Sequence, residues 1–311
     1  MTNIVDYFSY YDGTCKELLK LRVNLLNDYV DHFVICESNK THSGIPIEYK
    51  LKERIKEYRL PADKITVIEL DIPDAENLIV EDIDYFNSGI NSSNINSVKA
   101  RARERLQRDA LIYTLNQFES ETLFIVGDCD EIINPLCIKF IADIASNTNN
   151  AIIKIPLVYL EGRADLRVYN NITGEPKPWD LSLFICKKKH LLMTRPINIR
   201  CNHKTPYPVV YCTQDDKVIQ DLGWHFSWMG GPAKRTVKRD AFCHYEDSLP
   251  YLKTKSYNNE MTKKLLSQDI VEGSIAPSLE SDSVMKLYDI YNLPPLVLYD
   301  IEIRNFLFGA N

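Results

Sequence analysis

Three carboxylates stand close together at the end of an apolar run near the middle of the chain. Leu123–Val126 and Gly127 are followed by Asp128, Asp130 and Glu131. Side chains two residues apart on an extended segment point the same way, so we expect Asp128 and Asp130 to converge on one divalent cation. An ion held by only one or two carboxylates completes its shell with water and substrate phosphates. The motif therefore predicts a site for a metal ion and a nucleotide diphosphate.

The same residues allow a purely structural interpretation. Asp128 or Asp130 would then accept hydrogen bonds from backbone N–H groups in a turn before a helix that Pro135 opens. The motif alone leaves both readings open.

The elements around this motif alternate between strand and helix. Alternation of this kind predicts an α/β fold with a mostly parallel sheet and helices on both faces. We expect a loop between the third strand and the next helix, and a helical, polar pattern beyond residue 250. The expected strands are Ile4–Tyr10, His32–Cys36, Lys64–Leu70, Leu123–Val126, Ala151–Leu160 and Leu181–Cys186; the expected helices are Cys15–Tyr29, Val98–Phe118 and Leu136–Ala145; the expected loop is Asp71–Ser97.

The helix expected at Val98–Phe118 carries four arginines. Its apolar stripe leaves Arg101, Arg103, Arg105 and Arg108 on the other faces. On composition alone we favour a solvated helix with ion pairs at helical spacing. The alternative is that Arg101 and Arg108 approach a phosphate, because arginine binds phosphate in a bidentate manner.

Composition limits the class of protein. The chain has 311 residues, of which 45% are hydrophobic and 26% charged, and its formal net charge is −6. This charge argues against a nucleic-acid partner, which normally requires a strongly basic face. No segment approaches the roughly 18 apolar residues of a membrane span. We expect a soluble, cytoplasmic protein whose eight scattered cysteines are mostly reduced and buried.

Three segments together resemble glycosyltransferase family 17, the family of the enzyme that adds the bisecting N-acetylglucosamine to N-glycans. The first is the loop Glu37–Gly44, with the pattern Glu-Ser-x-x-Thr-x-x-Gly. The second is Gln107-Arg108-Asp109 leading to Asp128-Cys-Asp-Glu-Ile132. The third is Gly223-Trp-His-Phe-Ser-Trp-Met-Gly-Gly231, followed by Phe242-Cys-His-Tyr-Glu246. The resemblance covers roughly residues 4 to 250.

The resemblance implies an A-type glycosyltransferase fold and an inverting, metal-dependent reaction. The expected donor is UDP-N-acetylglucosamine, the expected acceptor a glycan, and the expected cofactor Mn²⁺ or Mg²⁺. We expect residues 1–250 to form the transferase domain and residues 251–311 to form a helical extension packed on its core. Trp224 and Trp228 suit either a sugar-stacking role or the core, with the core favoured for Trp224.

The resemblance also suggests roles for individual residues. Asp130 is expected to bind the metal directly, with Asp128 facing the ribose or reaching the metal through water, and with Glu131 orienting its neighbours. His225 is a candidate ligand of the metal or the diphosphate, or else a core histidine. The expected site residues are Asp128, Asp130 and His225 for the metal; Glu37, Asn39, Arg101, Arg108 and Asp128 for the nucleotide; and Glu246, Asp247 and Glu161 for the catalytic base.

Three other classes of protein remain as alternatives. An aspartyl phosphatase needs an Asp-x-Asp-x-Thr or Val pattern, whereas Ile132 follows Glu131 here. A sugar-nucleotide nucleotidyltransferase needs a glycine-rich loop after its first strand, and the segment Tyr10–Cys15 has one glycine. A catalytically inactive carbohydrate- or nucleotide-binding domain would bind a sugar nucleotide without turning it over.

Overall fold

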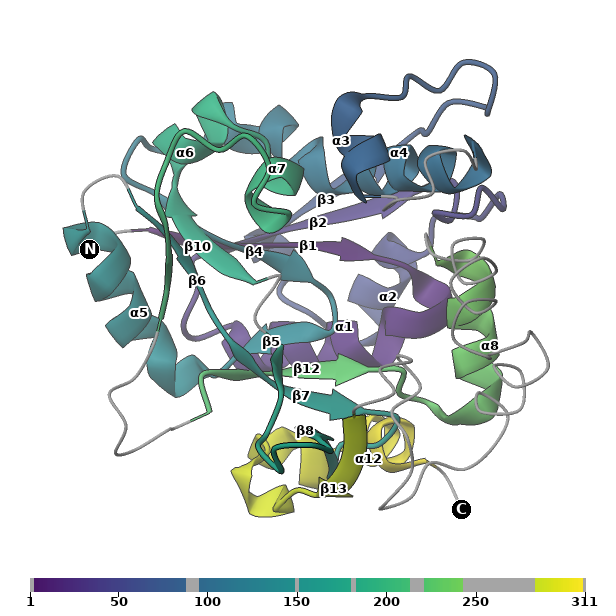
Figure 1. Ribbon diagram of the computed structural model, residues 1–311, viewed down its shortest axis with the longest axis vertical. Coiled ribbons are helices and arrows are strands. Elements are labelled where there is room, and N and C mark those ends of the chain that lie inside the picture. The colour runs from purple at the N-terminus through teal and green to yellow at the C-terminus, as the bar shows by residue number, and fades with distance from the viewer. Residues whose placement is uncertain are drawn as a thin grey trace.

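A computed structural model describes residues 3–87, 95–148, 151–179, 183–212, 221–242 and 283–309. In this part of the chain the largest sheet has seven strands in the order β11-β6-β10-β4-β1-β2-β3. Four of them run parallel at its centre and one edge, as Figure 1 shows. These four are β1 (Ile4–Tyr10), β2 (His32–Ser38), β3 (Ile65–Leu70) and β4 (Leu123–Asp128).

The other three strands extend this sheet beyond β4. The strand β10 (Phe184–Lys187) is antiparallel to both β4 and β6 (Ile152–Lys154), and β11 (Val209–Tyr211) is parallel to β6. The parallel part of the sheet and its crossover helices confirm the α/β class expected from the sequence.

Helices cover both faces of this sheet because its strands are apolar on both sides. Along β1, Val5 and Tyr7 face one apolar cluster, while Phe8 and Tyr10 face another. Figure 1 shows the helices on each side. One face carries α1 (Asp12–Leu26), α2 (Leu51–Glu57) and α5 (Pro135–Asn147), and the other carries α4 (Ile95–Asp109), the 3₁₀ helix η2 (Ala110–Gln117), α6 (Lys188–Met193) and α7 (Pro196–Arg200).

A second sheet, largely antiparallel, lies below the first on the side of α1 (Figure 1). Its described strands follow the order β13-β8-β7-β12-β5, and β9 pairs with β7. Among these described strands, β7 and β12 pair in parallel and the other pairs are antiparallel. Their bounds are β5 (Glu131–Ile133), β7 (Leu157–Glu161), β8 (Leu166–Asn170), β9 (Pro178–Trp179), β12 (Gly223–Ser227) and β13 (Ser283–Leu287). The sequence analysis did not predict this sheet.

Several sequence-based boundaries differ from the structure. The run Ala151–Leu160 is two strands in different sheets, because the chain leaves β6 at Ile155-Pro156 and enters β7. The expected loop Asp71–Ser97 contains α3 (Asp82–Asn87), which packs on α4, and α4 itself starts at Ile95. The helix expected as far as Phe118 becomes 3₁₀ from Ala110 onward.

The described C-terminal segment packs on the core, and it contains a strand as well as helices. The strand β13 precedes η3 (Ile290–Asn292), α11 (Pro295–Tyr299) and α12 (Ile301–Phe308). Val297 and Leu307 are fully buried in the cluster that α1 and β5 share. The division into two domains at residue 250 stays a prediction.

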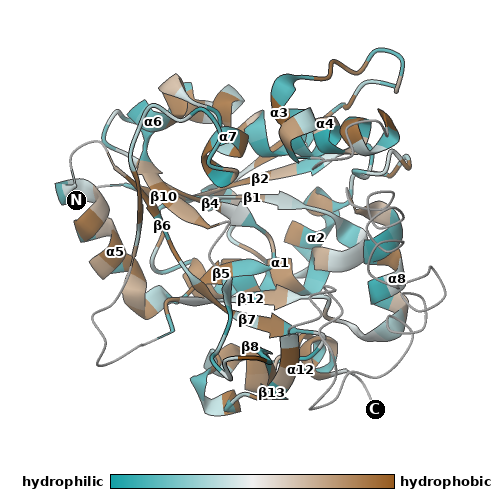
Figure 2. Cartoon of the chain, viewed as in Figure 1, coloured by the Kyte–Doolittle hydropathy of each residue, from teal (hydrophilic) through white to brown (hydrophobic). Residues whose placement is uncertain are grey.

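One further helix, α8 (Gly231–Ala241), stands across the carboxyl ends of the parallel strands (Figure 1). Figure 2 shows it as mainly hydrophilic, in contrast to the hydrophobic strands of the sheets. Within the described residues, the helices are all too short or too polar to cross a bilayer. Seven of the eight cysteines are free thiols, five of them buried, and Cys243 lies outside the described residues.

Candidate functional site

The acidic motif forms a tight turn between the two sheets. The strand β4 ends at Asp128, Cys129 and Asp130 form the turn, and β5 starts at Glu131. Because the extended segment stops at Asp128, the expectation that Asp128 and Asp130 share one strand face is wrong. The turn directs the two carboxylates to different sets of partners.

Asp128 faces the arginines of α4 and α7. Its carboxylate accepts hydrogen bonds from Arg108 Nε at 3.2 Å and Nη2 at 2.7 Å, and from Arg200 Nη2 at 2.7 Å. Burial alone would raise the pKa of Asp128, but the two guanidinium groups outweigh burial and lower it. The carboxylate is therefore ionised and already neutralised by two fixed cations.

Asp130 faces α8 and β12. Its Oδ2 lies 2.8 Å from Lys238 Nζ and 3.6 Å from His225 Nε2. Burial opposes ionisation of this carboxyl, which is only 8% exposed, yet Lys238 and His225 hold its pKa well below the usual range. Asp130 is therefore a buried anion that faces a cation and an imidazole.

Glu131 links the turn to neighbouring elements by hydrogen bonds. Its fully buried carboxylate accepts hydrogen bonds from the Asp128 N–H at 2.8 Å, from Trp179 Nε1 at 2.8 Å and from both terminal nitrogens of Arg200 at 2.9 and 3.0 Å. Gly127 makes this possible, since a Cβ there would lie 2.9 Å from Glu131 Oε2. This arrangement agrees with the orienting role expected for Glu131.

Arg22 of α1 anchors the backbone of the turn. It is fully buried and bonds both oxygens of Asp6 on β1, at 2.8 and 2.7 Å. Its Nη1 also donates to the carbonyl oxygens of Asp128 at 2.6 Å and Glu131 at 2.8 Å. The turn is thus fixed to the first strand and the first helix at once.

The register of β12 on β5 places His225 opposite Glu131. The imidazole stacks on Trp179 with ring centroids 4.2 Å apart and on Tyr159 at 5.4 Å. It is 5% exposed, and its Nδ1 is buried without a hydrogen-bond partner. His225 therefore combines the packing expected of a core histidine with the position expected of a ligand.

The donor set at Asp130 is small. Among the described residues, no group of three or more His, Cys, Asp or Glu side chains is arranged to hold a metal ion by itself. Asp130 and His225 offer one oxygen and one nitrogen on the same side of the turn. This pair fits a divalent ion that takes its remaining ligands from phosphate and water.

The Glu37–Gly44 loop is tied to its surroundings by internal hydrogen bonds. Glu37 accepts from the N–H groups of Lys50 and Leu51, both at 2.9 Å, at the start of α2. Asn39 donates to Asp71 Oδ1 at 3.1 Å and accepts from the Ile72 N–H at 2.8 Å. Both side chains therefore already have protein partners, and a nucleotide-binding role for either stays a prediction.

Three of the four arginines of α4 are buried and the fourth, Arg108, is half-buried, so the solvated helix favoured on composition is wrong. The ion pairs expected at helical spacing are present. Arg101 pairs with Glu104 at 3.0 Å, and Arg108 pairs with Glu104 as well as with Asp128. Arg103 is 7% exposed, and its Nη1 donates to the His42 carbonyl at 3.1 Å. Burial lowers the pKa of Arg103. The helix is thus positioned by ion pairs on its buried side.

The structure describes some of the remaining candidate residues and leaves out others. Glu161 ends β7 and is fully buried, opposite Ser227 of β12. Glu246 and Asp247 lie outside the described residues. Trp224 is 3% exposed in the core, as favoured from the sequence. Trp228 is half-buried near the turn, and its φ of 56° is unusual for a non-glycine residue.

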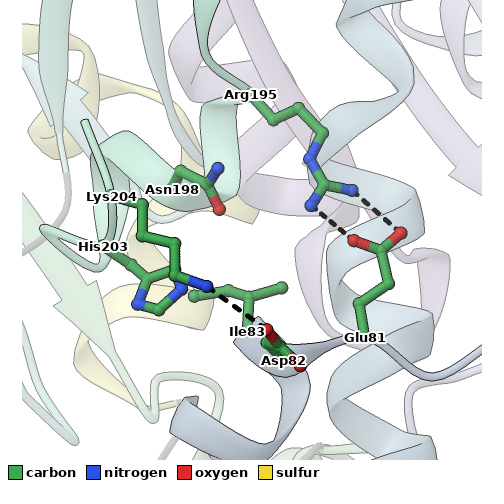
Figure 3. Close-up of a pocket in the computed structure, with 7 residues that line it drawn as sticks. All are labelled: Glu81, Asp82, Ile83, Arg195, Asn198, His203 and Lys204. Atoms are coloured by element: carbon green, nitrogen blue, oxygen red, sulfur yellow. Dashed lines mark hydrogen bonds and ion pairs between the residues drawn. The ribbon is translucent and has the colours of Figure 1, made fainter. Parts of the chain in front are cut away.

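A hollow of about 350 Å³ lies beyond α7 (Figure 3). Its charged groups pair across it: Arg195 with Glu81 at 2.5 Å and Lys204 with Asp82 at 3.2 Å. The acidic turn does not contribute to its lining.

Sequence reasoning missed three residues of the site, namely Arg22, Arg200 and Lys238. Arg22 and Lys238 lie on helices that show no motif, and Arg200 is the last residue of the short helix α7. Of the three, only Arg22 could have been found from the sequence. It lies within the apolar stripe of its helix, and a charged residue in such a position implies a buried partner of opposite charge.

The acidic turn lies at the carboxyl ends of the parallel strands, the edge at which open α/β sheets bind ligands. This arrangement agrees with the A-type glycosyltransferase fold expected from the sequence. Residues 13–154 match the model of glycosyltransferase family 17. Over these residues the chain is similar to the family, and the match supports a glycosyltransferase activity. The match includes the Glu37 loop, the arginine helix and the acidic turn; it ends before the Gly223–Gly231 block.

Solved structures show more distant likenesses. The chain is similar to a 4-diphosphocytidyl-2C-methyl-D-erythritol synthase, with 9% identity, coverage of 69% of this chain and 94% of that chain, and a TM-score of 0.37. It is also similar to Mycobacterium tuberculosis glucosyl-3-phosphoglycerate synthase, with 11% identity, coverage of 77% and 79%, and a TM-score of 0.33. No curated protein sequence matches the chain significantly.

Proposed function

We propose that the protein is a metal-dependent, inverting glycosyltransferase that transfers N-acetylglucosamine from UDP-N-acetylglucosamine to a glycan acceptor. The observation that carries this proposal is the acidic turn. Asp130 and His225 lie on one side of it, and Arg108 and Arg200 bind Asp128 on the other side. The donor sugar and the inverting outcome are those that the resemblance to glycosyltransferase family 17 implies.

The site offers two kinds of group to a departing diphosphate. A divalent cation bound at Asp130 and His225 would neutralise the charge that develops on the leaving phosphate oxygens. Arg108 and Arg200 are held rigidly by Asp128, with their guanidinium groups at the same turn. Fixed donors of this kind stabilise developing charge without reorganisation during the reaction.

Direct displacement at the anomeric carbon also needs a base for the acceptor hydroxyl. Glu161, Glu246 and Asp247 are the candidates, and all three remain proposals. Glu161 lies at the end of β7, the strand that neighbours His225 on β12.

Release of UDP from a panel of UDP- and GDP-sugars, measured with and without Mn²⁺, tests the function. We expect Mn²⁺-dependent turnover with UDP-N-acetylglucosamine and a loss of at least about 100-fold in Asp130→Ala, because a metal contributes several kcal/mol to transition-state stabilisation. Lys234→Met, one turn before Lys238 on α8, serves as a control for a change in local charge, because its ammonium bonds the Gly13 carbonyl. Near wild-type turnover in Asp130→Ala would contradict the metal role of this turn.

An inactive binding domain makes a different forecast. It would show a rise in melting temperature with UDP and Mn²⁺, as any ligand selective for the folded state produces, but no release of UDP at any enzyme concentration. A rise with GDP-sugars and none with UDP would overturn the donor assignment.

A further inference from the structure

A lysine already lies on the carboxylate oxygen that faces the imidazole. Lys238 Nζ is 2.8 Å from Asp130 Oδ2, and His225 Nε2 is 3.6 Å from the same oxygen. A divalent ion that uses this oxygen and this nitrogen would stand beside the ammonium group. Two cations at such short range repel each other strongly in a partly buried site.

The ammonium is well placed to leave this oxygen while α8 stays where it is. The carbonyl groups of Asp240 and Ala241 accept hydrogen bonds from Ser43 at 2.6 and 3.2 Å, so the end of the helix is fixed to the Glu37–Gly44 loop. Lys238 has a long side chain that is 24% exposed, and its ammonium lies 5.5 Å from the centre of the Trp228 ring. The ring offers the ammonium a second contact through a cation–π interaction.

Neutralisation of Asp130 explains why a lysine is needed there. The carboxylate is 8% exposed, and its two partners among the described side chains are Lys238 and His225. A buried carboxylate without a cation is costly. In the absence of a metal, Lys238 supplies that charge.

We propose that Lys238 is a tethered cation that holds Asp130 in the metal-free protein and is displaced by the divalent ion, so that it sets the metal affinity of the site. This inference rests on the proposed function, because it requires metal binding at Asp130. Lys238 is a positioning residue here: it acts on the metal through Asp130.

Mn²⁺ binding to the full chain, measured from the loss of the free aqueous Mn²⁺ signal in electron paramagnetic resonance, tests the proposal without any turnover. We expect Lys238→Met to bind Mn²⁺ at least about tenfold more tightly than wild type, which corresponds to about 1.4 kcal/mol. Lys238→Arg, which keeps the charge, should bind as weakly as wild type. The matched control is Lys234→Met, one turn earlier on α8, where the ammonium bonds the Gly13 carbonyl at 3.1 Å; its affinity should not change.

Asp130→Ala distinguishes a failure of the metal site from a failure of the role proposed for Lys238. If it loses Mn²⁺ binding while Lys238→Met binds like wild type, the role of Lys238 is refuted and the metal site stands. If it keeps wild-type binding, the metal site and the role of Lys238 both fall. An equal gain in Lys234→Met would reduce the effect to general charge and also refute the proposal.

A melting-temperature measurement covers the case in which Lys238→Met folds poorly. In Lys238→Met, Asp130 has no lysine beside it, so Mn²⁺ does not have to displace an ammonium group. Added Mn²⁺ should therefore raise the melting temperature of this variant more than that of wild type. An equal or smaller rise would refute the displacement.

Discussion

The buried pair of Arg22 and Asp6 gives the sharpest prediction about stability. Arg22→Met keeps an unbranched apolar stem but removes two bonds to Asp6 and two to the carbonyls of the acidic turn. Both residues of the pair are fully buried. Asp6 is then left as a buried carboxylate without its cation, and the turn loses its anchor.

The expected magnitude follows from that geometry. Breaking a buried ion pair by removing one partner costs about 3–5 kcal/mol. This is a large part of the roughly 5–15 kcal/mol by which proteins are stable. Arg54→Met is the matched control: it removes a guanidinium that also bonds both oxygens of an aspartate, Asp12, but both side chains are about one quarter exposed. Such a pair contributes about 0–1 kcal/mol.

Urea unfolding followed by circular dichroism measures the difference. Asp6→Asn combined with Arg22→Met should be more stable than Arg22→Met alone by at least about 1 kcal/mol, because no charge is left buried without a partner. A loss in Arg22→Met no larger than that in Arg54→Met would refute this account of the turn.

Three further predictions concern the site and its surroundings. His225→Phe keeps a ring against Trp179 but removes Nε2, so Mn²⁺ affinity should fall at least about tenfold with little change in melting temperature. A lower melting temperature with unchanged Mn²⁺ affinity would show that His225 is a core residue and not a ligand. Burial raises the pKa of Asp109 to about 7, against the opposing Ile197 N–H and Arg195. The folded state therefore binds this proton more tightly than the unfolded state, and this contribution to the free energy of unfolding should decline as pH rises from about 4 to about 7; an unfolding free energy of wild type relative to Asp109→Asn that does not change with pH would contradict it. Gly44→Ala should destabilise the protein by about 1–3 kcal/mol, because φ is +97° and the new Cβ would lie 2.9 Å from the Arg103 guanidinium; Gly174→Ala, with φ of +76° and open space, should cost less in the same urea assay.

Local pattern was sufficient for the parallel core of the fold. Ile4–Tyr10 was found with its observed ends, because β1 is a central strand buried on both faces. Lys64–Leu70 was found within a residue of its ends, although β3 is a half-buried edge strand. Pattern failed at Ala151–Leu160, where one apolar run serves two sheets. Apolar residues are required in both sheets, so the run carries no mark of where the chain changes layer.

The arginine helix shows the same limit for charged residues. Composition favoured solvated arginines, yet Arg105 is 3% exposed and bonds Asp84 of α3. The carboxylate that permits its burial lies 21 residues away in the sequence. Local spacing on α4 does not contain that information.

The sequence by itself determined the acidic motif, its place after a buried strand and the similarity to glycosyltransferase family 17. These are properties of short segments, in which strand length, turn residues and carboxylates are all read locally. The tertiary structure alone decided how the carboxylates are used. Asp128 pairs with Arg108 and Arg200, whereas Asp130 pairs with Lys238 and lies near His225. The two carboxylates differ in this way because β4 ends at Asp128 and Asp130 lies in the turn between the two sheets. Charges on five separate elements neutralise one another only after those elements pack, and an electrostatic balance of that kind has no signature in sequence spacing.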